Sequence, residues 1–222
     1  MPERRADPAV RVRLLEGAAR LLAEEGPSAL TLRRVATEAD TSTMAVYTHF
    51  GSMPDLADAV VAEGFSRLAA LLADVPRTDD AITDLARLGR AYLVNARQNP
   101  HLYAVMFGTA SLGKYRPQTA DERERGRYTF DEIVETAGRA VEQGRLRPAE
   151  PLAIASQLWT AIHGYVMLDV GGYFGEDGVE NVLVPMFVSL LSGLGADPDA
   201  ALASIKTLAG HRRSVPLARV VR

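Results

Sequence analysis

Hydrophobic residues recur every three or four positions along almost the whole chain, which is the spacing that places them on one face of a helix. Polar residues fill the positions between them, so each predicted helix has one buried side and one side facing solvent. No segment shows the strict alternation of a strand, and no internal repeat is evident. In the first predicted helix the apolar positions are Val10, Leu14, Ala18, Leu21 and Leu22. The pattern therefore predicts an all-α protein.

Four helices are predicted in the first third of the chain, and glycine, proline and capping residues mark their ends. Gly26-Pro27 ends the first helix, and Ser28 or Thr31 can cap the second. Asp40 and Thr41 form the next turn, because aspartate tolerates the left-handed backbone that such turns often need. Ser52 can cap the fourth helix. The predicted helices span about residues 10–25, 31–39, 42–50 and 54–72.

The remaining chain predicts six further helices, separated by glycine and proline. They span about residues 80–98, 101–107, 120–143, 151–173, 179–194 and 198–209, with a Gly/Pro-bearing loop at 108–119. Pro185 is expected to kink the fifth of these helices or to displace its start. We expect three regions: a helix-turn-helix domain at 1–56 with a linking helix to about 73, a larger helical domain at 74–210, and a disordered basic tail at 211–222.

The stretch from Leu30 to Leu56 predicts two helices joined by a tight turn, the geometry that lets one helix lie in the major groove of DNA. Val46 and Phe50 of the second helix are expected to pack with apolar residues of the neighbouring helices in a small core. The other side chains of this helix are then left on the outer surface: Thr43, Met44, Ala45, Tyr47, Thr48 and His49.

This exposed set suits a DNA groove. Small or apolar side chains near a helix N-terminus can approach base edges and thymine methyl groups, while Tyr47 and His49 can hydrogen-bond phosphates. An ordinary helical hairpin with both of these residues half-buried is the alternative, since such hairpins also occur in proteins that never touch DNA. Arginines that could flank DNA are concentrated nearby: Arg4, Arg5, Arg11, Arg13, Arg33 and Arg34.

Composition narrows the possible functions. The formal net charge is −3, with 25 Lys and Arg against 28 Asp and Glu, so DNA binding would depend on local charge placement. The absence of cysteine excludes disulfides and thiolate zinc sites. The four histidines have no metal-ligand spacing and no nucleophile or phosphate-loop motif is present, so we expect no enzyme, no metal and no cofactor. Without a signal-peptide core or a membrane-spanning run, we expect a cytoplasmic protein with no membrane contact.

Three sequence blocks occur in a recognisable order: TLRRVA at 31–36, STMAVYTHF at 42–50 and SMPDL at 52–56. Together they closely resemble the N-terminal domain of the tetracycline-repressor (TetR) family of bacterial transcriptional regulators. The resemblance covers about residues 10–60. It implies that Thr31 and Arg33 approach phosphates, that Tyr47 and His49 clamp the DNA backbone, and that three residues face the bases: Thr43, Met44 and Ala45.

Two residues depart from the family pattern. Met53 stands where the family usually has lysine near the start of the fourth helix, so one expected phosphate contact is missing. The arginines of the arm and of the first two helices would have to supply that charge. Asp40 occupies the turn position usually held by glycine, which makes the turn stiffer.

The larger C-terminal region is expected to dimerise and to sense a ligand. The helix at 179–194 is apolar nearly all round and therefore needs two partners. We expect the second partner to be the same helix of another subunit, with burial inside one subunit as the alternative. Its apolar residues are Val179, Val182, Leu183, Met186, Phe187, Leu190, Leu191 and Leu194.

Trp159, His163 and Met167 form a row at four-residue spacing, which suits the wall of a ligand cavity or, equally, a core histidine packed under a tryptophan. The block WTAIHG at 159–164 also resembles the Trp…His-Gly signature of one C-terminal subgroup of the same family. Further candidates for ligand binding, each of which could simply be core, are Tyr92, His101, Tyr103, Met106 and Phe107.

These observations predict a homodimeric repressor that binds a palindromic operator in double-stranded DNA. A small apolar or amphipathic effector would release it. One alternative is a constitutive or activating DNA-binding regulator, which would show no ligand-dependent release. The other is a helical small-molecule-binding protein or enzyme without DNA binding, which would leave no footprint on any operator.

Overall fold

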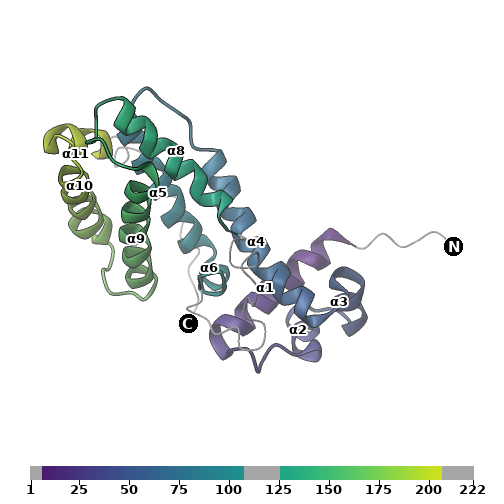
Figure 1. Ribbon diagram of the computed structural model, residues 1–222. Helices are drawn as coiled ribbons and strands as arrows, with labels where there is room; N and C mark the ends of the chain where they lie inside the picture. Colours follow the sequence, from purple (N-terminus) through teal and green to yellow (C-terminus); the bar gives the residue numbers. More distant parts are fainter. Residues whose placement is uncertain (1–6, 108–125, 207–222) are drawn as a thin grey trace. The chain divides into compact units, whose positions relative to one another are not determined.

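The computed structural model describes residues 7–107 and 126–206. Within these two ranges, all regular secondary structure is helical (Figure 1). This confirms the predicted all-α class. None of the described helices has the length and apolar character needed to cross a membrane. The helices are α1 (Pro8–Glu25), α2 (Leu32–Glu38), α3 (Thr43–Phe50), α4 (Met53–Ala73), α5 (Ala81–Gln98), α6 (Pro100–Met106), α8 (Tyr128–Glu142), α9 (Pro151–Val170), η2 (a π-helical turn, Val179–Leu183), α10 (Val184–Gly193) and α11 (Pro198–Lys206).

The helix predicted over 179–194 is divided in the structure. Its first five residues form the π-helical turn η2, and the α-helix α10 starts only at Val184, with Pro185 in its first turn. Proline has no N–H to donate to the preceding turn, so the regular ladder begins at this point. Several predictions lie outside the described residues: Arg4, Arg5, the loop at 108–119, the start of the helix at 120–143 and the tail at 211–222.

The described residues form two compact units. The first lies within Met1–Val75 and Ala91–Glu132, and the second within Pro76–Arg90 and Ile133–Arg222. The packing thus places α6 with the N-terminal helices, because α6 contacts both α1 and α4. The predicted boundary between the DNA-binding and ligand-binding domains at residue 74 is a division by function along the sequence, and it differs from this division by contacts. It stays a prediction.

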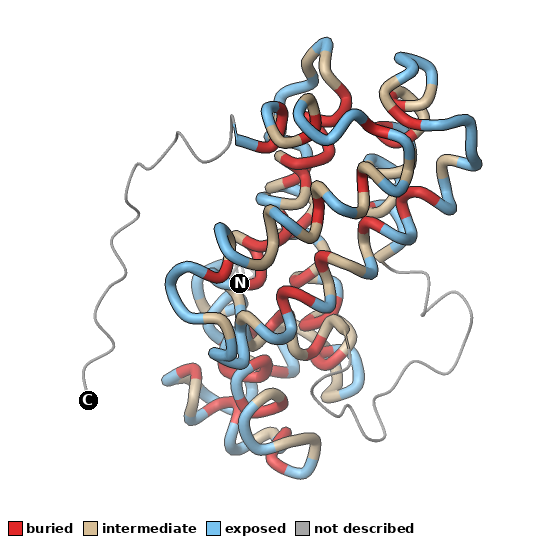
Figure 2. The backbone as a smooth tube through the Cα atoms, turned by 90° about the vertical axis from the view of Figure 1, so that its left-hand side faces the viewer, coloured by how far each residue is buried: buried red, intermediate tan, exposed pale blue. Residues whose placement is uncertain are grey.

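An apolar core packs α1, α2, α3, α4 and α6 of the first unit together, and buried positions recur along the described helices (Figure 2). Leu14 of α1, Val35 of α2, Val46 of α3 and Leu56 of α4 are all fully buried in it. Phe50 packs against the same core, as the sequence predicts. Burying each such Val or Leu stabilises the fold by about 1.5–3 kcal/mol, so this core fixes α3 relative to α1, α2 and α4.

The turn between α2 and α3 is set by local backbone bonds. Asp40 has φ 46°, and its N–H donates to the Thr37 carbonyl at 3.1 Å. The N–H of Thr41 donates to the Ala36 carbonyl at 2.9 Å, which completes a Schellman motif at the end of α2. Ser42 then caps α3 by accepting from the N–H of Ala45. The predicted left-handed aspartate turn is confirmed.

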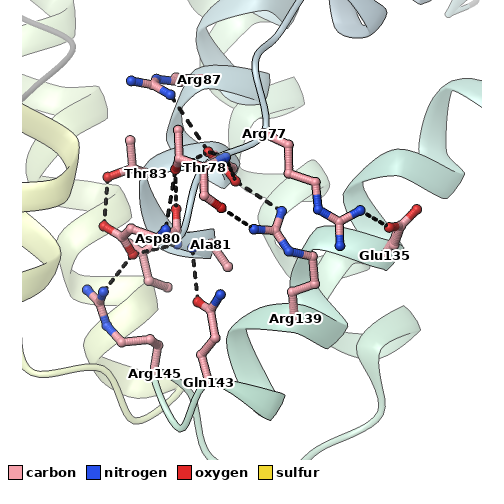
Figure 3. Close-up of polar contacts among 12 residues, drawn as sticks. Arg77, Thr78, Asp80, Ala81, Thr83, Arg87, Glu135, Arg139, Gln143 and Arg145 are labelled. Carbon is pink, nitrogen blue, oxygen red and sulfur yellow. Dashed lines mark hydrogen bonds and ion pairs between the residues drawn. The ribbon is translucent and has the colours of Figure 1, made fainter.

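A polar cluster in the second unit ties the start of α5 to α8 (Figure 3). Asp84 of α5 is buried and accepts hydrogen bonds from the N–H and hydroxyl of Thr78 at 2.9 and 2.7 Å. Arg139 of α8 lies 3.0 Å from the same carboxylate and also donates to the Thr78 carbonyl. Gln143 accepts from the N–H of Ala81. The first turn of α5 is therefore held by charge-assisted bonds.

Asp80 forms the second half of the polar cluster and reaches α11. Its carboxylate accepts from the hydroxyls of Ser204 and Thr83 at 2.6 and 2.7 Å and from Arg145 at 2.6 Å. Burial raises the pKa of Asp80, but the hydrogen bonds from Ser204 and Thr83 and the charge of Arg145 together hold that pKa below its ordinary value. The folded protein therefore favours the ionised carboxylate.

This lowered pKa predicts an acid-labile contribution to stability. A group whose pKa is lower in the folded state adds stability above its unfolded pKa, about 3.9 for aspartate, and loses it as pH falls through the folded pKa. Urea unfolding at a series of pH values should therefore show the wild type losing its advantage over Asp80→Asn below about pH 4. Asp79→Asn, at the exposed neighbouring position, is the control. A constant difference down to the lowest pH would contradict the prediction.

Candidate nucleic-acid interface

Helix α3 presents a compact outer surface because one residue anchors it. Val46 is fully buried, while Met44 and Tyr47 on either side of it expose 67% and 49% of their surface. Thr43 and Thr48 are exposed as well. Ala45 and His49 are half-buried, and the His49 ring lies 6.2 Å from that of Phe50. The six residues predicted for the outer surface thus lie around one buried anchor, with two of them partly covered.

The start of α2 supplies a second set of predicted contacts. Thr31 caps this helix, since its Oγ1 accepts from the N–H of Arg34 at 3.4 Å, and its hydroxyl proton stays available to a phosphate. Arg33 is exposed, and no ion pair to it occurs among the described residues. Arg34 is exposed too, but its guanidinium is bound to the carboxylate of Glu25.

The exposed α1 arginines Arg11 and Arg13 have partners within the protein, which the sequence pattern does not reveal. Arg11 lies over the Phe50 ring, 5.3 Å from its centroid. Arg13 donates its Nε–H to the Ala39 carbonyl at 3.1 Å. Arg11 thus contacts α3 and Arg13 contacts the C-cap residue of α2.

Four aromatic rings gather where α4, α5 and α6 meet in the first unit. The Phe107 ring centroid lies 4.9 Å from that of Tyr103, 5.9 Å from Tyr92 and 5.7 Å from Phe65. The two tyrosine hydroxyls are 3.2 Å apart. Burial raises the pKa of Tyr103 to about 12, although its bond to Tyr92 opposes this. Three of the predicted ligand residues thus form one uncharged aromatic cluster.

Two other predicted ligand residues of the first unit lie elsewhere. Met106 packs against α4 at Gly64, where a Cβ would collide with its side chain. His101 lies 3.7 Å from the carboxylate of Glu24 and lines an open groove of about 370 Å³ beside Arg13 and other residues of α1. The charged groove is a different environment from the aromatic cluster.

In the second unit, Trp159 and His163 stack on one another with centroids 5.2 Å apart and an interplanar angle of 27°. Burial lowers the pKa of His163, which favours the neutral imidazole. Met167 does not join them and has 44% of its surface exposed. The predicted row of three residues therefore supplies a stacked pair and one outward side chain.

The outward face of α9 is a feature that the sequence prediction missed. It carries no charged residue, although it is exposed in the single chain. At Gly164 the space is open, because a Cβ built there would meet no heavy atom within 4 Å. The sequence could have indicated this face, because Asp169 is the only acidic or basic residue of α9 apart from His163. The exposed residues are Leu152, Ala153, Ser156, Gln157, Thr160, Gly164, Met167, Leu168 and Val170.

Comparison with known proteins assigns both parts of the chain. Residues 14–60 match the family model described as bacterial regulatory proteins, tetR family, and residues 85–191 match the tetracyclin repressor-like C-terminal domain. The HTH-type transcriptional regulator Mb1581 of Mycobacterium bovis is 30% identical over 168 residues, which cover 69% of this chain and 72% of that protein. The chain belongs to the TetR family of transcriptional regulators.

Two solved structures share the TetR-family fold with this chain. A protein of unknown function from Rhodococcus sp. RHA1 is 28% identical and has a TM-score of 0.69, over 87% of this chain and 98% of that one. AibR in complex with isovaleryl coenzyme A and operator DNA is 19% identical and has a TM-score of 0.55, over 72% and 85% of the two chains.

Membership of the TetR family decides the coarse function. The protein is a transcriptional regulator with a helix-turn-helix DNA-binding domain, so the alternative of an ordinary hairpin at Leu30–Leu56 is not supported. All nine predicted DNA contacts lie in the N-terminal match at 14–60, and all eight predicted ligand contacts lie in the C-terminal match at 85–191. The individual residues within those matches remain predictions.

Proposed function

We propose that this TetR-family regulator is a homodimeric repressor that binds a near-palindromic operator and is released by a small apolar or amphipathic effector. The observation that carries the DNA-binding part is the anchored outer surface of α3, where Met44 and Tyr47 project on either side of buried Val46. In a two-fold dimer, two such helices would enter successive major grooves about 34–36 Å apart.

Base reading is assigned to the N-terminal part of α3, namely Thr43, Met44 and Ala45. Their side chains offer one hydroxyl and apolar groups, which fits contact with thymine methyl groups and base edges. Tyr47, Thr48 and His49 follow on the same helix and are assigned to phosphates. The Thr48 hydroxyl donates to the Met44 carbonyl at 2.9 Å, so it would have to give up that bond to donate to a phosphate oxygen, which can only accept. From α2, Thr31 and Arg33 would contact phosphates, as described above.

The homodimer is supported by the uncharged outward face of α9 together with α10. In α10, Phe187 and Leu191 are buried in the single chain, whereas Met186, Leu190 and Leu194 stay partly exposed. Ser156 and Thr160 on α9 donate their hydroxyls to carbonyls of their own helix at 2.7 Å. A face whose two hydroxyls are bonded within their own helix and that carries no charge is suited to contact with a second copy.

Ligand sensing is assigned to two separate groups of residues. The first is the aromatic cluster of Tyr92, Tyr103 and Phe107, which is uncharged at neutral pH. The second is the Trp159–His163 pair with Met167, where the block WTAIHG also supports placement in the Trp…His-Gly subgroup. His101 and Met106 complete the set of proposed ligand residues. Apolar and aromatic walls with few polar atoms fit an apolar or amphipathic effector.

Helix α6 offers a route from the aromatic cluster to the DNA-binding helices. Tyr103 joins the cluster from α6, while Leu102 and Val105 of the same helix belong to the core that includes Leu14 and Val60. An effector that prefers a shifted α6 would therefore disturb α1 and α4. By linkage, the effector must lower the affinity for the operator by the same factor by which the operator lowers the affinity for the effector. A ~100-fold release needs a coupling of about 2.7 kcal/mol.

Substitutions on α3 should separate base reading from phosphate binding. We expect Tyr47→Phe to weaken binding roughly tenfold on all DNA sequences, because it removes one bond to a charged phosphate. Thr43→Val or Met44→Gln should instead change which operator sequence is preferred. Competition selection on a randomised duplex measures both effects, with Ser66→Ala on the exposed side of α4 as the control. Unchanged preference in both the Thr43 and Met44 variants would show that base reading is misassigned.

A further inference from the structure

Arg34 is joined to Glu25 by two parallel hydrogen bonds. Its Nη1 and Nη2 each lie 2.6 Å from a different carboxylate oxygen of Glu25. This is the paired geometry in which guanidinium and carboxylate bind with the greatest directional specificity. Glu25 is the last residue of α1 and Arg34 lies in the first turn of α2, so the contact closes the connection between the two helices.

The connection that this pair closes has a defined backbone. Gly26 has φ 82°, and the N–H of Ala29 donates to its carbonyl at 3.1 Å. The N–H of Thr31 donates to the Ala29 carbonyl at 2.8 Å, and Thr31 then caps α2. The backbone that joins Glu25 to Arg34 is therefore held in one conformation. This favours a persistent two-bond ion pair between their side chains over a transient surface contact.

The opposite end of α2 is held to α1 in a similar way. Arg13 donates to the carbonyl of Ala39, the C-cap residue of α2, and Arg20 pairs with Glu38. Between these contacts, Gly17 lets the helices approach closely, since a Cβ there would lie 3.0 Å from the Glu38 Cβ. Arginine side chains thus brace α2 against α1 at both ends.

We propose that Arg34 is a positioning residue, which fixes the start of α2 through Glu25, and that α2 contacts phosphate through Thr31 and Arg33 instead. The ion pairs support these two different roles. Glu25 neutralises the charge of Arg34, while Arg33 has no ion pair within residues 7–107 and 126–206. The inference rests on the proposed role of Thr31 and Arg33, and it reassigns Arg34, which the sequence places among the DNA contacts.

Salt titration distinguishes a brace from a phosphate contact. Binding to a fluorescein-labelled duplex long enough for both half-sites would be measured by anisotropy across a KCl series. Each phosphate contact contributes about 0.9 to the slope of log K against log salt. Because the dimer carries two copies of Arg33, we expect Arg33→Gln to lower that slope by about 1.8 and Arg34→Gln to leave it unchanged. A slope lowered equally by Arg34→Gln would overturn the inference. If Arg33→Gln alone left the slope unchanged, the proposed phosphate role of Arg33 would fail instead.

The sign of the Glu25 effect gives a second test. A brace predicts that Glu25→Gln and Arg34→Gln both weaken DNA binding, each by less than tenfold, and that the double variant is no worse than either single one. Glu24→Gln, at the exposed neighbouring position, controls for loss of one negative charge. Relative to that control, tighter binding by Glu25→Gln would mean that Glu25 competes with DNA for Arg34, which would overturn the inference.

Hydrogen exchange on the DNA-free protein keeps the proposal testable even where affinities change little. Both Glu25→Gln and Arg34→Gln should speed amide exchange in residues 32–38, because the start of α2 loses its tie to α1. Arg33→Gln should leave that exchange as in the wild type. Unchanged exchange in the first two variants would also overturn the positioning role.

Discussion

Replacing Arg139 by methionine should cost about 3–5 kcal/mol of stability, because it leaves a buried carboxylate without its hydrogen-bonded charge partner. The side chains of Arg139 and Asp84 are only 12% and 4% exposed. Arg87 also pairs with Asp84, but at 3.8 Å its Nη1 is beyond hydrogen-bond distance of the carboxylate. The Thr78 carbonyl loses its donor as well. Since small domains are stable by about 5–15 kcal/mol, this one change removes a large share of the total.

Urea unfolding followed by circular dichroism would measure the Arg139→Met loss, at one fixed protein concentration because dimerisation adds to stability. Arg77→Met is the matched control. Arg77 pairs with Glu135 on the same helix α8, but both side chains are more than half exposed, so the expected cost is about 0–1 kcal/mol. Equal losses in the two variants would contradict the view that Arg139 and Asp84 hold the polar cluster together.

Replacing Gly164 by arginine should convert the protein to monomers and reduce operator affinity by about 10³-fold or more, towards the level of non-specific binding. Gly164 lies on the uncharged outward face of α9, one turn after Thr160. An arginine there has free space within its own chain, but it would place an unpaired charge in a contact between subunits. Arginine also favours an exposed helix more than glycine does, so unfolding is not the expected cause.

Analytical ultracentrifugation and operator titration of Gly164→Arg would be run together with Ala149→Arg, an exposed position just before α9. The control should remain dimeric and bind as the wild type does. A Gly164→Arg variant that sediments as a dimer would show that α9 does not form the contact. A wild type that is monomeric would contradict the proposed homodimer itself.

The sequence predicts those features that depend on neighbouring residues. The caps at Thr31 and Ser52 and the left-handed turn at Asp40 each involve residues within five positions of one another, and the structure confirms them. Pro185 marks the start of α10 for the same reason. Local bonding preferences are encoded by residue type, so they can be read before the fold is known.

Side-chain partners across helices could not be predicted in this way. Arg13 and Ala39 are 26 residues apart and Asp84 and Arg139 are 55 apart, so their pairing depends on how the helices pack. The row on α9 shows a related limit. Eight residues advance a helix by about 80° beyond two full turns, so Met167 turns outward while Trp159 stacks on His163. Four-residue spacing indicates a shared face only over a short distance.

We propose that this TetR-family protein binds one operator sequence as a dimer and releases it when a small molecule binds. Selection of protein-bound fragments from the source genome, repeated with a small-molecule extract added, tests it most directly. We expect enrichment of a near-palindrome whose half-sites lie about one helical turn apart, with loss of enrichment when the extract is present. Bound fragments that share no sequence, or enrichment that the extract leaves unchanged, would contradict it.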